Sequence, residues 1–302
     1  SWDIVVIGSG IAALRSAIAA SDAGATVAVI ESGGPSNAQS KACSTGLAVS
    51  VFESDHIHHG KNTSSAGFGL SNSSIVNQRC ESALDNLIEL EKWGFNFQRN
   101  ESGSPYPSDS IGHSSPRLCT AGDSTGREII RILEEQCMKR GIPRKYDLHS
   151  VSISVESERV RGLVVLDVQT GVITSIQCKA IILATQDHSG LWIDEGGNGL
   201  GASLALRAGA KLRGMEFISW HPLCVPTSNY RLPISLLSAG ARVRKSNGDD
   251  VELTGTMTEA SVSLLDGDYV LDARNVPIPE REWFTTTVNI LESRFSINLW
   301  KD

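Results

Sequence analysis

The sequence predicts an α/β protein of 302 residues in two domains. A βαβ pattern occupies the N-terminal 31 residues, and three segments with a hydrophobic period of two lie between residues 150 and 177. After Gly214 the pattern loosens into short strands and turns. We therefore expect a first domain over residues 1–217, built on a βαβ unit and a three-stranded meander, and a smaller α+β domain over residues 218–302.

The N-terminal βαβ pattern has clear boundaries. Residues 3–7 are an apolar run of strand length, and the helical pattern that opens at residues 8–13 ends at Gly24. Residues 25–30 form a second buried strand, which Glu31 follows. We expect a right-handed crossover between the two strands.

Residues 8–13 read Gly-Ser-Gly-Ile-Ala-Ala, which fits a dinucleotide-binding fingerprint in its full strand–turn–helix context. Gly8 would make the tight turn, Gly10 would let the backbone meet a pyrophosphate, and Ala13 would allow close packing of helix on strand. Glu31 would accept hydrogen bonds from the adenosine ribose. The alternative is a glycine-rich turn with a solvated Glu31.

The rest of the first domain distinguishes two kinds of dinucleotide protein. Helices are expected over residues 74–93, 127–139 and 199–208, and strands over residues 150–155, 160–168, 172–177 and 179–185. In the first of these helices the expected inward stripe is Ile75, Leu84, Leu87, Leu90 and Trp93. An NAD domain would continue as alternating strands and helices, whereas here a long stretch of loop and helix precedes the meander. This layout favours a flavoprotein.

Composition excludes several other classes. Lys and Arg total 27 against 34 Asp and Glu, so the chain carries a net charge of −7 and has no basic run for nucleic acid. No apolar stretch reaches the ~20 residues of a membrane span, and no signal peptide is visible at the N-terminus. We expect a cytoplasmic or organelle-matrix protein, with a peripheral place on a membrane complex as one alternative. The six cysteines show no CxxC spacing, which favours reduced thiols.

Two other chemistries have weaker support. His56, His58 and His59 cluster, but only Asp55 accompanies them, so we expect no metal site. Asp187-His188 lacks the Gly-x-Ser-x-Gly turn that a hydrolase of that type would show.

Eight ordered motifs resemble one family. They are residues 4–31, His59-x-x-Asn62-Thr63 through Asn72, residues 90–99, 117–126, 162–165, 182–185 and 205–210, and Met215-Glu216-Phe217-x-x-x-His221-Pro222. On these segments the chain resembles the succinate dehydrogenase/fumarate reductase flavoprotein family, which includes L-aspartate oxidase. The resemblance implies a Rossmann-like FAD-binding domain and a capping domain that closes over a small dicarboxylate-like substrate.

The resemblance also implies site residues. His221 matches the family's substrate-binding His, which would hold a substrate carboxylate. The cofactor-binding positions carried over are Gly8, Ser9, Gly10, Ile11, Ala12, Ala13, Glu31, Ser32, Ser40, Gly46, Val151, Ala184, Thr185 and Asn198. Some family members attach FAD through a His in the loop that is here residues 38–46, where this chain has none. We therefore expect noncovalent FAD.

The chain departs from the family at two internal places. Gln186-Asp187 replace two glycines that the family packs near flavin. Ile234 and Leu237 fall where the family has a Glu and a proton-delivering Arg, and the alternating pattern makes Arg242 and Arg244 solvent-facing strand residues.

The chain also stops before the family's closing segment. From this we expect a first domain without its final strand and helix, and a second protein chain that completes the fold. Two functions remain open: an FAD-dependent oxidoreductase subunit completed by a partner, or a catalytically degenerate member that serves as a structural or flavin-holding subunit.

Overall fold

The structure is a computed structural model, and it describes residues 1–33, 46–52, 54–191, 197–218, 220–225, 228 and 230–301. The chain divides into two compact units. Unit 1 is Ser1–Ala42 with Gly126–Ile218, and unit 2 is Cys43–Thr125 with Ser219–Asp302. The second boundary lies beside the expected one at residues 217 and 218, while residues 43–125 group with the C-terminal segment rather than with the nucleotide fingerprint.

Unit 1 is built on one mixed sheet. Among the described residues its strand order is β5-β2-β1-β8-β7-β6. The bounds are β1 Trp2–Ile7, β2 Val27–Ile30, β5 Arg144–Lys145, β6 Leu148–Glu156, β7 Arg159–Asp167 and β8 Ile173–Leu183. β5, β2, β1 and β8 run parallel, whereas β7 pairs antiparallel with both β8 and β6. This confirms the α/β prediction of a parallel βαβ unit followed by a meander.

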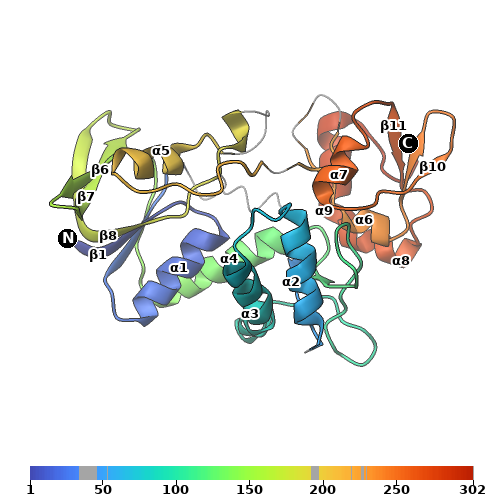
Figure 1. Ribbon diagram of the computed structural model, residues 1–302, viewed down its shortest axis with the longest axis horizontal. Coiled ribbons are helices and arrows are strands. Elements are labelled where there is room, and N and C mark those ends of the chain that lie inside the picture. The colour runs from blue at the N-terminus through green and yellow to red at the C-terminus, as the bar shows by residue number, and fades with distance from the viewer. Residues whose placement is uncertain are drawn as a thin grey trace. The chain divides into compact units, whose positions relative to one another are not determined.

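Three helices accompany this sheet in Figure 1: α1 (Ile11–Asp22), α4 (Thr125–Lys139) and α5 (Leu200–Arg207). α1 buries Ala13, Leu14, Ala17 and Ile18 because these residues recur at helical spacing on one face. The thiol of Cys137 on α4 lies 3.9 Å from the carbonyl oxygen of Leu14, so α1 and α4 are in contact. α5 packs on β6, and a short helix, η3 (Ser189–Leu191), precedes it.

The two strands expected over residues 172–177 and 179–185 are one strand, β8. Its first half pairs with β7, in the register Gln177↔Gly162, and its second half begins to pair with β1 at Cys178↔Trp2. No turn residue marks the point where a single strand changes its pairing partner. The sequence therefore shows only a change in its hydrophobic pattern there.

In unit 2, residues 46–125 include a helical pair and a small two-stranded antiparallel sheet. α2 (Asp55–Ala66) packs on α3 (Ser73–Lys92), and β3 (Leu47–Ala48) pairs with β4 (Leu118–Cys119). The predicted inward stripe of α3 was partly wrong. Ile75 is 44% exposed, and the buried residues are Val76, Cys80, Leu87 and Leu90. Asn72 caps the helix through the Ile75 amide, which leaves Ile75 in the first turn on the solvent side.

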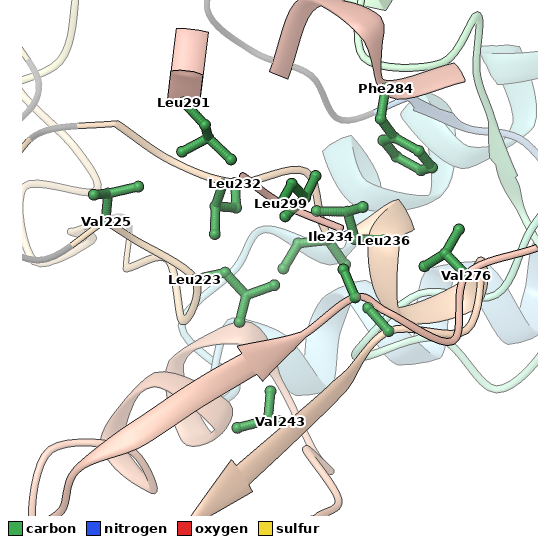
Figure 2. Close-up of a cluster of buried hydrophobic side chains, with 12 residues drawn as sticks. Leu223, Val225, Leu232, Ile234, Leu236, Val243, Val276, Phe284, Leu291 and Leu299 are labelled. Atoms are coloured by element: carbon green, nitrogen blue, oxygen red, sulfur yellow. The ribbon is translucent and has the colours of Figure 1, made fainter. Parts of the chain in front are cut away.

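The C-terminal segment of unit 2 has a sheet of order β10-β9-β11: Asp250–Val251, Arg242–Lys245 and Tyr269–Asp272. Short helices surround it: α6 Ser235–Ser238, α7 Met257–Val262, α8 Ile278–Arg281, η4 Glu282–Phe284, α9 Thr285–Ile290 and η5 Leu291–Phe295. Their shared core is apolar (Figure 2), and Leu236 and Leu291 are at its most buried positions. This is the α+β texture that the sequence predicts.

Candidate functional site

The turn after β1 requires glycine at position 8. Gly8 has φ +129°, and a Cβ atom there would lie 2.2 Å from the carbonyl oxygen of Ala184. The Gly8 amide donates to the Ile30 carbonyl at 3.0 Å, and the Ala184 amide donates to the Ile7 carbonyl at 2.9 Å. The carboxyl ends of β1, β2 and β8 therefore meet at one edge, which is where open α/β sheets bind ligands.

Residues 9–13 start α1 from this edge. Gly10 is the N-cap with extended backbone, φ −80° and ψ −178°, and no side chain caps the helix. Ser9, Gly10 and Ile11 are partly exposed, Ala12 is exposed and Ala13 is fully buried. The first-turn amides and the helix dipole favour an anion such as a pyrophosphate at this end of α1.

Glu31 follows β2 at the same edge and is not solvated, because it is only 2% exposed. Its Oε1 accepts hydrogen bonds from Nε and Nη2 of Arg144, at 2.8 and 2.5 Å. Arg144 Nη1 also lies 3.0 Å from Glu134 Oε1. Ser32, next in the chain, is exposed.

The segment after β8 shows what replaces the two glycines of the family pattern. Ala184 and Thr185 are partly exposed, and a Cβ on Gly201 would lie 2.0 Å from Thr185 Oγ1, so α5 approaches Thr185 closely. Asp187 Oδ1 accepts from the Ser189 hydroxyl at 2.7 Å and from the Gly197 amide at 2.8 Å. Burial opposes ionisation of Asp187, but these bonds outweigh it and lower its pKa. Asp187 thus organises its own loop.

The other carried-over cofactor positions are scattered. The Val151 carbonyl on β6 accepts from Arg207 at 3.2 Å, and the Asn198 side chain accepts from the Leu200 amide at 3.1 Å. Gly46 belongs to unit 2, where a Cβ would lie 2.3 Å from the Cys119 carbonyl oxygen. Ser40 and most of the loop over residues 38–46 lie outside the described residues.

His221, the expected substrate-binding residue, lies in unit 2. Its Nδ1 is 2.9 Å from the Leu223 carbonyl oxygen and 3.2 Å from the Leu223 amide. Burial and the nearby Arg231 lower the pKa of His221 to about 4, while the bond with Leu223 acts in the opposite direction. The imidazole is therefore neutral at pH 7 and has one N–H, so it can donate to a carboxylate from Nε2 only in the tautomer whose Nδ1 accepts from the Leu223 amide.

The positions expected for a proton shuttle are apolar. Ile234 is 2% exposed in the core drawn in Figure 2, and Leu237 packs against that core. Arg242 on β9 is exposed, as predicted. The expectation for Arg244 was wrong, because its half-buried side chain pairs with Asp250 at 2.8 Å and with Asp272 at 3.0 Å.

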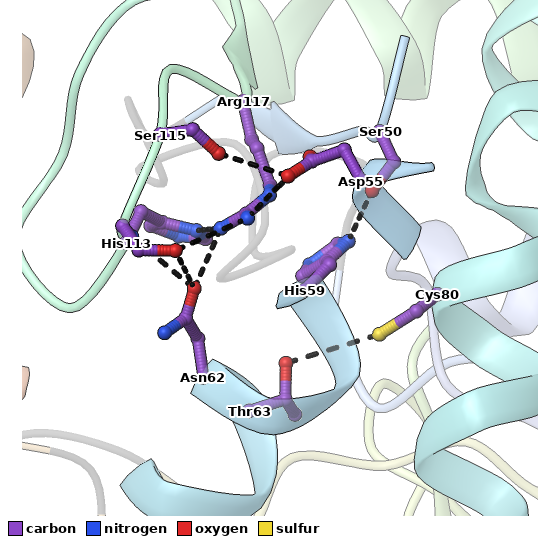
Figure 3. Close-up of polar contacts among 10 residues, drawn as sticks. Ser50, Asp55, His59, Asn62, Thr63, Cys80, His113, Ser115 and Arg117 are labelled. Atoms are coloured by element: carbon purple, nitrogen blue, oxygen red, sulfur yellow. Dashed lines mark hydrogen bonds and ion pairs between the residues drawn. The ribbon is translucent and has the colours of Figure 1, made fainter. Parts of the chain in front are cut away.

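A buried charge network around Arg117 was not anticipated (Figure 3). Arg117 is 0% exposed; its Nε and Nη2 bond the Asp55 carboxylate at 2.5 and 2.6 Å, and its Nη1 bonds Asn62 at 2.8 Å. The Arg117 guanidinium lowers the pKa of Asp55 to about 2. Burial lowers the pKa of His59, and it lowers the pKa of His113 to about 4. The spacing of Asp55, His59 and Asn62, four and seven residues on one helix, was the available signal.

Three further observations on the described residues concern disulfides, metal binding and membrane spans. Five described cysteines form no disulfide bond: Cys80, Cys119, Cys137, Cys178 and Cys224. No group of three or more metal-ligating side chains is found within the described ranges. In the same ranges no helix has both the length and the apolar character to span a bilayer.

Comparison with known proteins identifies the family. The profile of the FAD binding domain family matches residues 3–275. The succinate dehydrogenase flavoprotein subunit of Rickettsia felis is 26% identical over 294 residues, which is 92% of this chain and 49% of that protein. The fumarate reductase flavoprotein subunit of Escherichia coli K12 is 28% identical over 254 residues, which is 82% of this chain and 42% of that protein.

Solved structures agree. The Sdh1 complex of Mycobacterium smegmatis in the apo form matches with a TM-score of 0.77 at 25% identity, over 100% of this chain and 57% of that one. The quinol fumarate reductase of E. coli matches with a TM-score of 0.89 at 23% identity, over 100% of this chain and 58% of that one, which shows a common fold. The chain spans about half the length of the curated relatives it matches. It belongs to the FAD-binding flavoprotein family of the succinate dehydrogenase and fumarate reductase flavoprotein subunits, and its cofactor is FAD.

Proposed function

We propose that this chain binds FAD noncovalently at the carboxyl edge of β1, β2 and β8, and that it is the flavin-binding part of an FAD-dependent oxidoreductase subunit. One observation carries the proposal: Gly8, Glu31 and Ala184 converge on that edge, with the N-terminus of α1 opening from it. Tight backbone approach and an N-terminus without a side-chain cap fit a pyrophosphate.

The residues divide the work of holding the cofactor. Ser9 to Ala13 bind the pyrophosphate through main-chain amides, and Glu31 binds the adenosine ribose. Ser32, Ser40, Val151, Thr185 and Asn198 complete the proposed set in unit 1, whereas Gly46, which the family pattern also implies, belongs to unit 2. FAD, when bound, supplies hydride or electron transfer. Residues 32–48 contain no His, which supports a cofactor held without a covalent bond to this loop.

The proposed substrate is a small dicarboxylate, and a capping domain over residues 218–302 would bind it. His221 would orient a substrate carboxylate by donating a hydrogen bond from Nε2, in the tautomer whose Nδ1 accepts from the Leu223 amide. The relatives named as flavoprotein subunits support a partner chain. We further propose a place peripheral to a membrane complex, on the cytoplasmic or matrix side.

A second candidate is a degenerate member that holds flavin or serves assembly without turnover. Ile234 and Leu237 favour it, because neither side chain can donate a proton or bind a carboxylate and Ile234 is part of an apolar core. Fumarate-dependent oxidation of the bound flavin separates the two candidates.

FAD release on denaturation tests the binding proposal. The chain is saturated with FAD, desalted, precipitated with acid and centrifuged, and flavin is measured in pellet and supernatant. We expect yellow protein whose flavin appears entirely in the supernatant. Flavin in the pellet would contradict noncovalent binding.

A pair of variants on α1 tests the location. Gly10→Val should abolish FAD retention, because its branched side chain would occupy the pyrophosphate position. The control is Ala19→Val, which adds a branched side chain at an exposed position of the same helix and should retain FAD. Equal retention by both variants would place the cofactor elsewhere.

A further inference from the structure

A buried charge cluster adjoins the fingerprint at the end of β2. Its members are Glu31, Arg144 and Glu134, whose side chains are 1%, 10% and 24% exposed. Arg144 donates twice to Glu31 Oε1 and lies 3.0 Å from Glu134 Oε1. One guanidinium thus bridges a carboxylate at the ligand-binding edge and a carboxylate on α4.

The backbone explains why Arg144 reaches Glu31. β5 extends the sheet beside β2 in the register Val29↔Arg144 and Ile30↔Lys145. The Glu31 amide donates to the Lys145 carbonyl at 2.9 Å, which fixes the end of β2 against β5. Arg144 also stacks over the Tyr146 ring, 5.2 Å from its centroid, so the guanidinium is held from a third side.

The charges of the cluster favour a role for Glu31 in binding ribose over a role that only neutralises Arg144. Two carboxylates against one guanidinium leave the cluster net negative. A carboxylate offers about four lone-pair sites, so the two bonds from Arg144 do not exhaust the capacity of Glu31 to accept hydrogen bonds. A buried carboxylate held charged beside a cation is a stronger acceptor for a hydroxyl than a neutral group.

We propose that Arg144, itself held by Glu134, is a positioning residue that keeps the Glu31 carboxylate charged and oriented for the ribose hydroxyls of the adenosine half of FAD. This rests on the proposed FAD site. Arg144 acts through Glu31, so its contribution to nucleotide affinity exists only while Glu31 is present.

Calorimetric titration of the whole chain with FAD and with ADP tests this. Glu31→Gln should weaken ADP and FAD about 10-fold or more, as expected for a charge-assisted hydrogen bond. Arg144→Met should weaken the binding of both ligands by a similar factor. Arg144→Lys keeps the charge but not the paired N–H donors of the guanidinium, so it should weaken binding by less. In the Glu31→Gln background, Arg144→Met should cause no further loss.

A pH series adds a readout that a merely structural ion pair would not move. In Arg144→Met the buried Glu31 lacks its cation and protonates more readily, so ADP affinity should fall between pH 8 and pH 6 more steeply than in the unsubstituted chain. In the unsubstituted chain only the terminal phosphate of ADP should titrate over this range. The matched control is Arg140→Met, which removes a pair with Asp22 at the opposite end of α1 and should leave ADP affinity unchanged at every pH.

The outcomes are distinct. Affinity losses of Glu31→Gln and Arg144→Met that add in the double variant overturn the inference and leave the FAD site standing. If Arg144→Met binds ADP as tightly as the unsubstituted chain does, the inference is also overturned and the FAD site still stands. No binding of FAD or ADP by the unsubstituted chain overturns the proposed function and the inference together. If Arg144→Met does not fold, Arg144→Lys and Glu134→Gln carry the test: unchanged ADP affinity in both overturns the inference.

Discussion

The carboxyl edge of the sheet in unit 1 keeps the residue types of the family pattern, whereas the apolar core in the C-terminal segment of unit 2 departs from them. At the edge, each fingerprint position has the geometry its residue type suggests: Gly8 lies against Ala184, and Glu31 is a buried carboxylate with a cation. In the C-terminal segment, the positions of the expected Glu and Arg hold Ile234 and Leu237, which pack together with Leu236. The nucleotide fingerprint is therefore kept, while the positions expected for the proton shuttle are apolar.

The largest expected effect is at the edge. Gly8→Val should destabilise the chain by about 4 kcal/mol, because it combines a strained positive φ with overpacking against the Ala184 backbone. Gly24→Ala is the control: Gly24 has φ +87° with nothing within 4 Å of the added Cβ, so about 1 kcal/mol is expected. Urea unfolding measures both. Equal losses would show that Ala184 does not approach position 8.

The core of the C-terminal segment comes next. Leu236 is 0% exposed, so Leu236→Ala should cost about 3 kcal/mol through lost burial and a cavity. Leu265→Ala, at a side chain 62% exposed, should cost less than about 0.5 kcal/mol. Thermal unfolding reports both differences. If Leu236→Ala loses little unfolding free energy, the side chains around Leu236 pack loosely and its neighbour Leu237 does not pack against this core.

The Arg117 network gives a pH dependence. The folded-state pKa of Asp55 is about 2, against an ordinary 3.8, so its contribution is complete above pH 4 and is lost as pH falls toward 2. The contribution is up to about 2 kcal/mol. As pH falls from 6 to 2.5, urea unfolding should show a shrinking difference in unfolding free energy between the unsubstituted chain and Asp55→Asn. A constant difference across that range would contradict the ion pair.

The smallest expected effect is at Arg242. This exposed residue on β9 makes one bond, from Nη1 to the Ala241 carbonyl at 3.0 Å. Arg242→Ala should change unfolding free energy by less than about 0.5 kcal/mol and leave FAD affinity unchanged. If the chain oxidises its flavin with fumarate and Arg242→Ala abolishes this, Arg242 is the proton donor and Leu237 does not stand at the shuttle position.

Local patterns were predictable, and long-range pairings were not. The fingerprint and its strands could be predicted because turn, helix and strand signals are contiguous over residues 3–31. Arg144 and Glu31 lie 113 residues apart, and Arg117 and Asp55 lie 62 apart, so no periodicity connects them. β8 was divided in two because its environment changes midway, and Ile75 was misplaced because a cap, rather than hydrophobicity, sets where α3 begins.

We infer that this chain binds FAD while Ile234 and Leu237 occupy the positions expected for a proton shuttle. The most direct test is anaerobic: the chain is loaded with FAD, reduced with dithionite, mixed with fumarate and followed by flavin absorbance. Loss of a general acid alone costs about 10²–10⁴-fold in rate. We predict bound, reducible flavin that fumarate does not reoxidise faster than free reduced flavin. Fast reoxidation that disappears in His221→Ala would contradict the account.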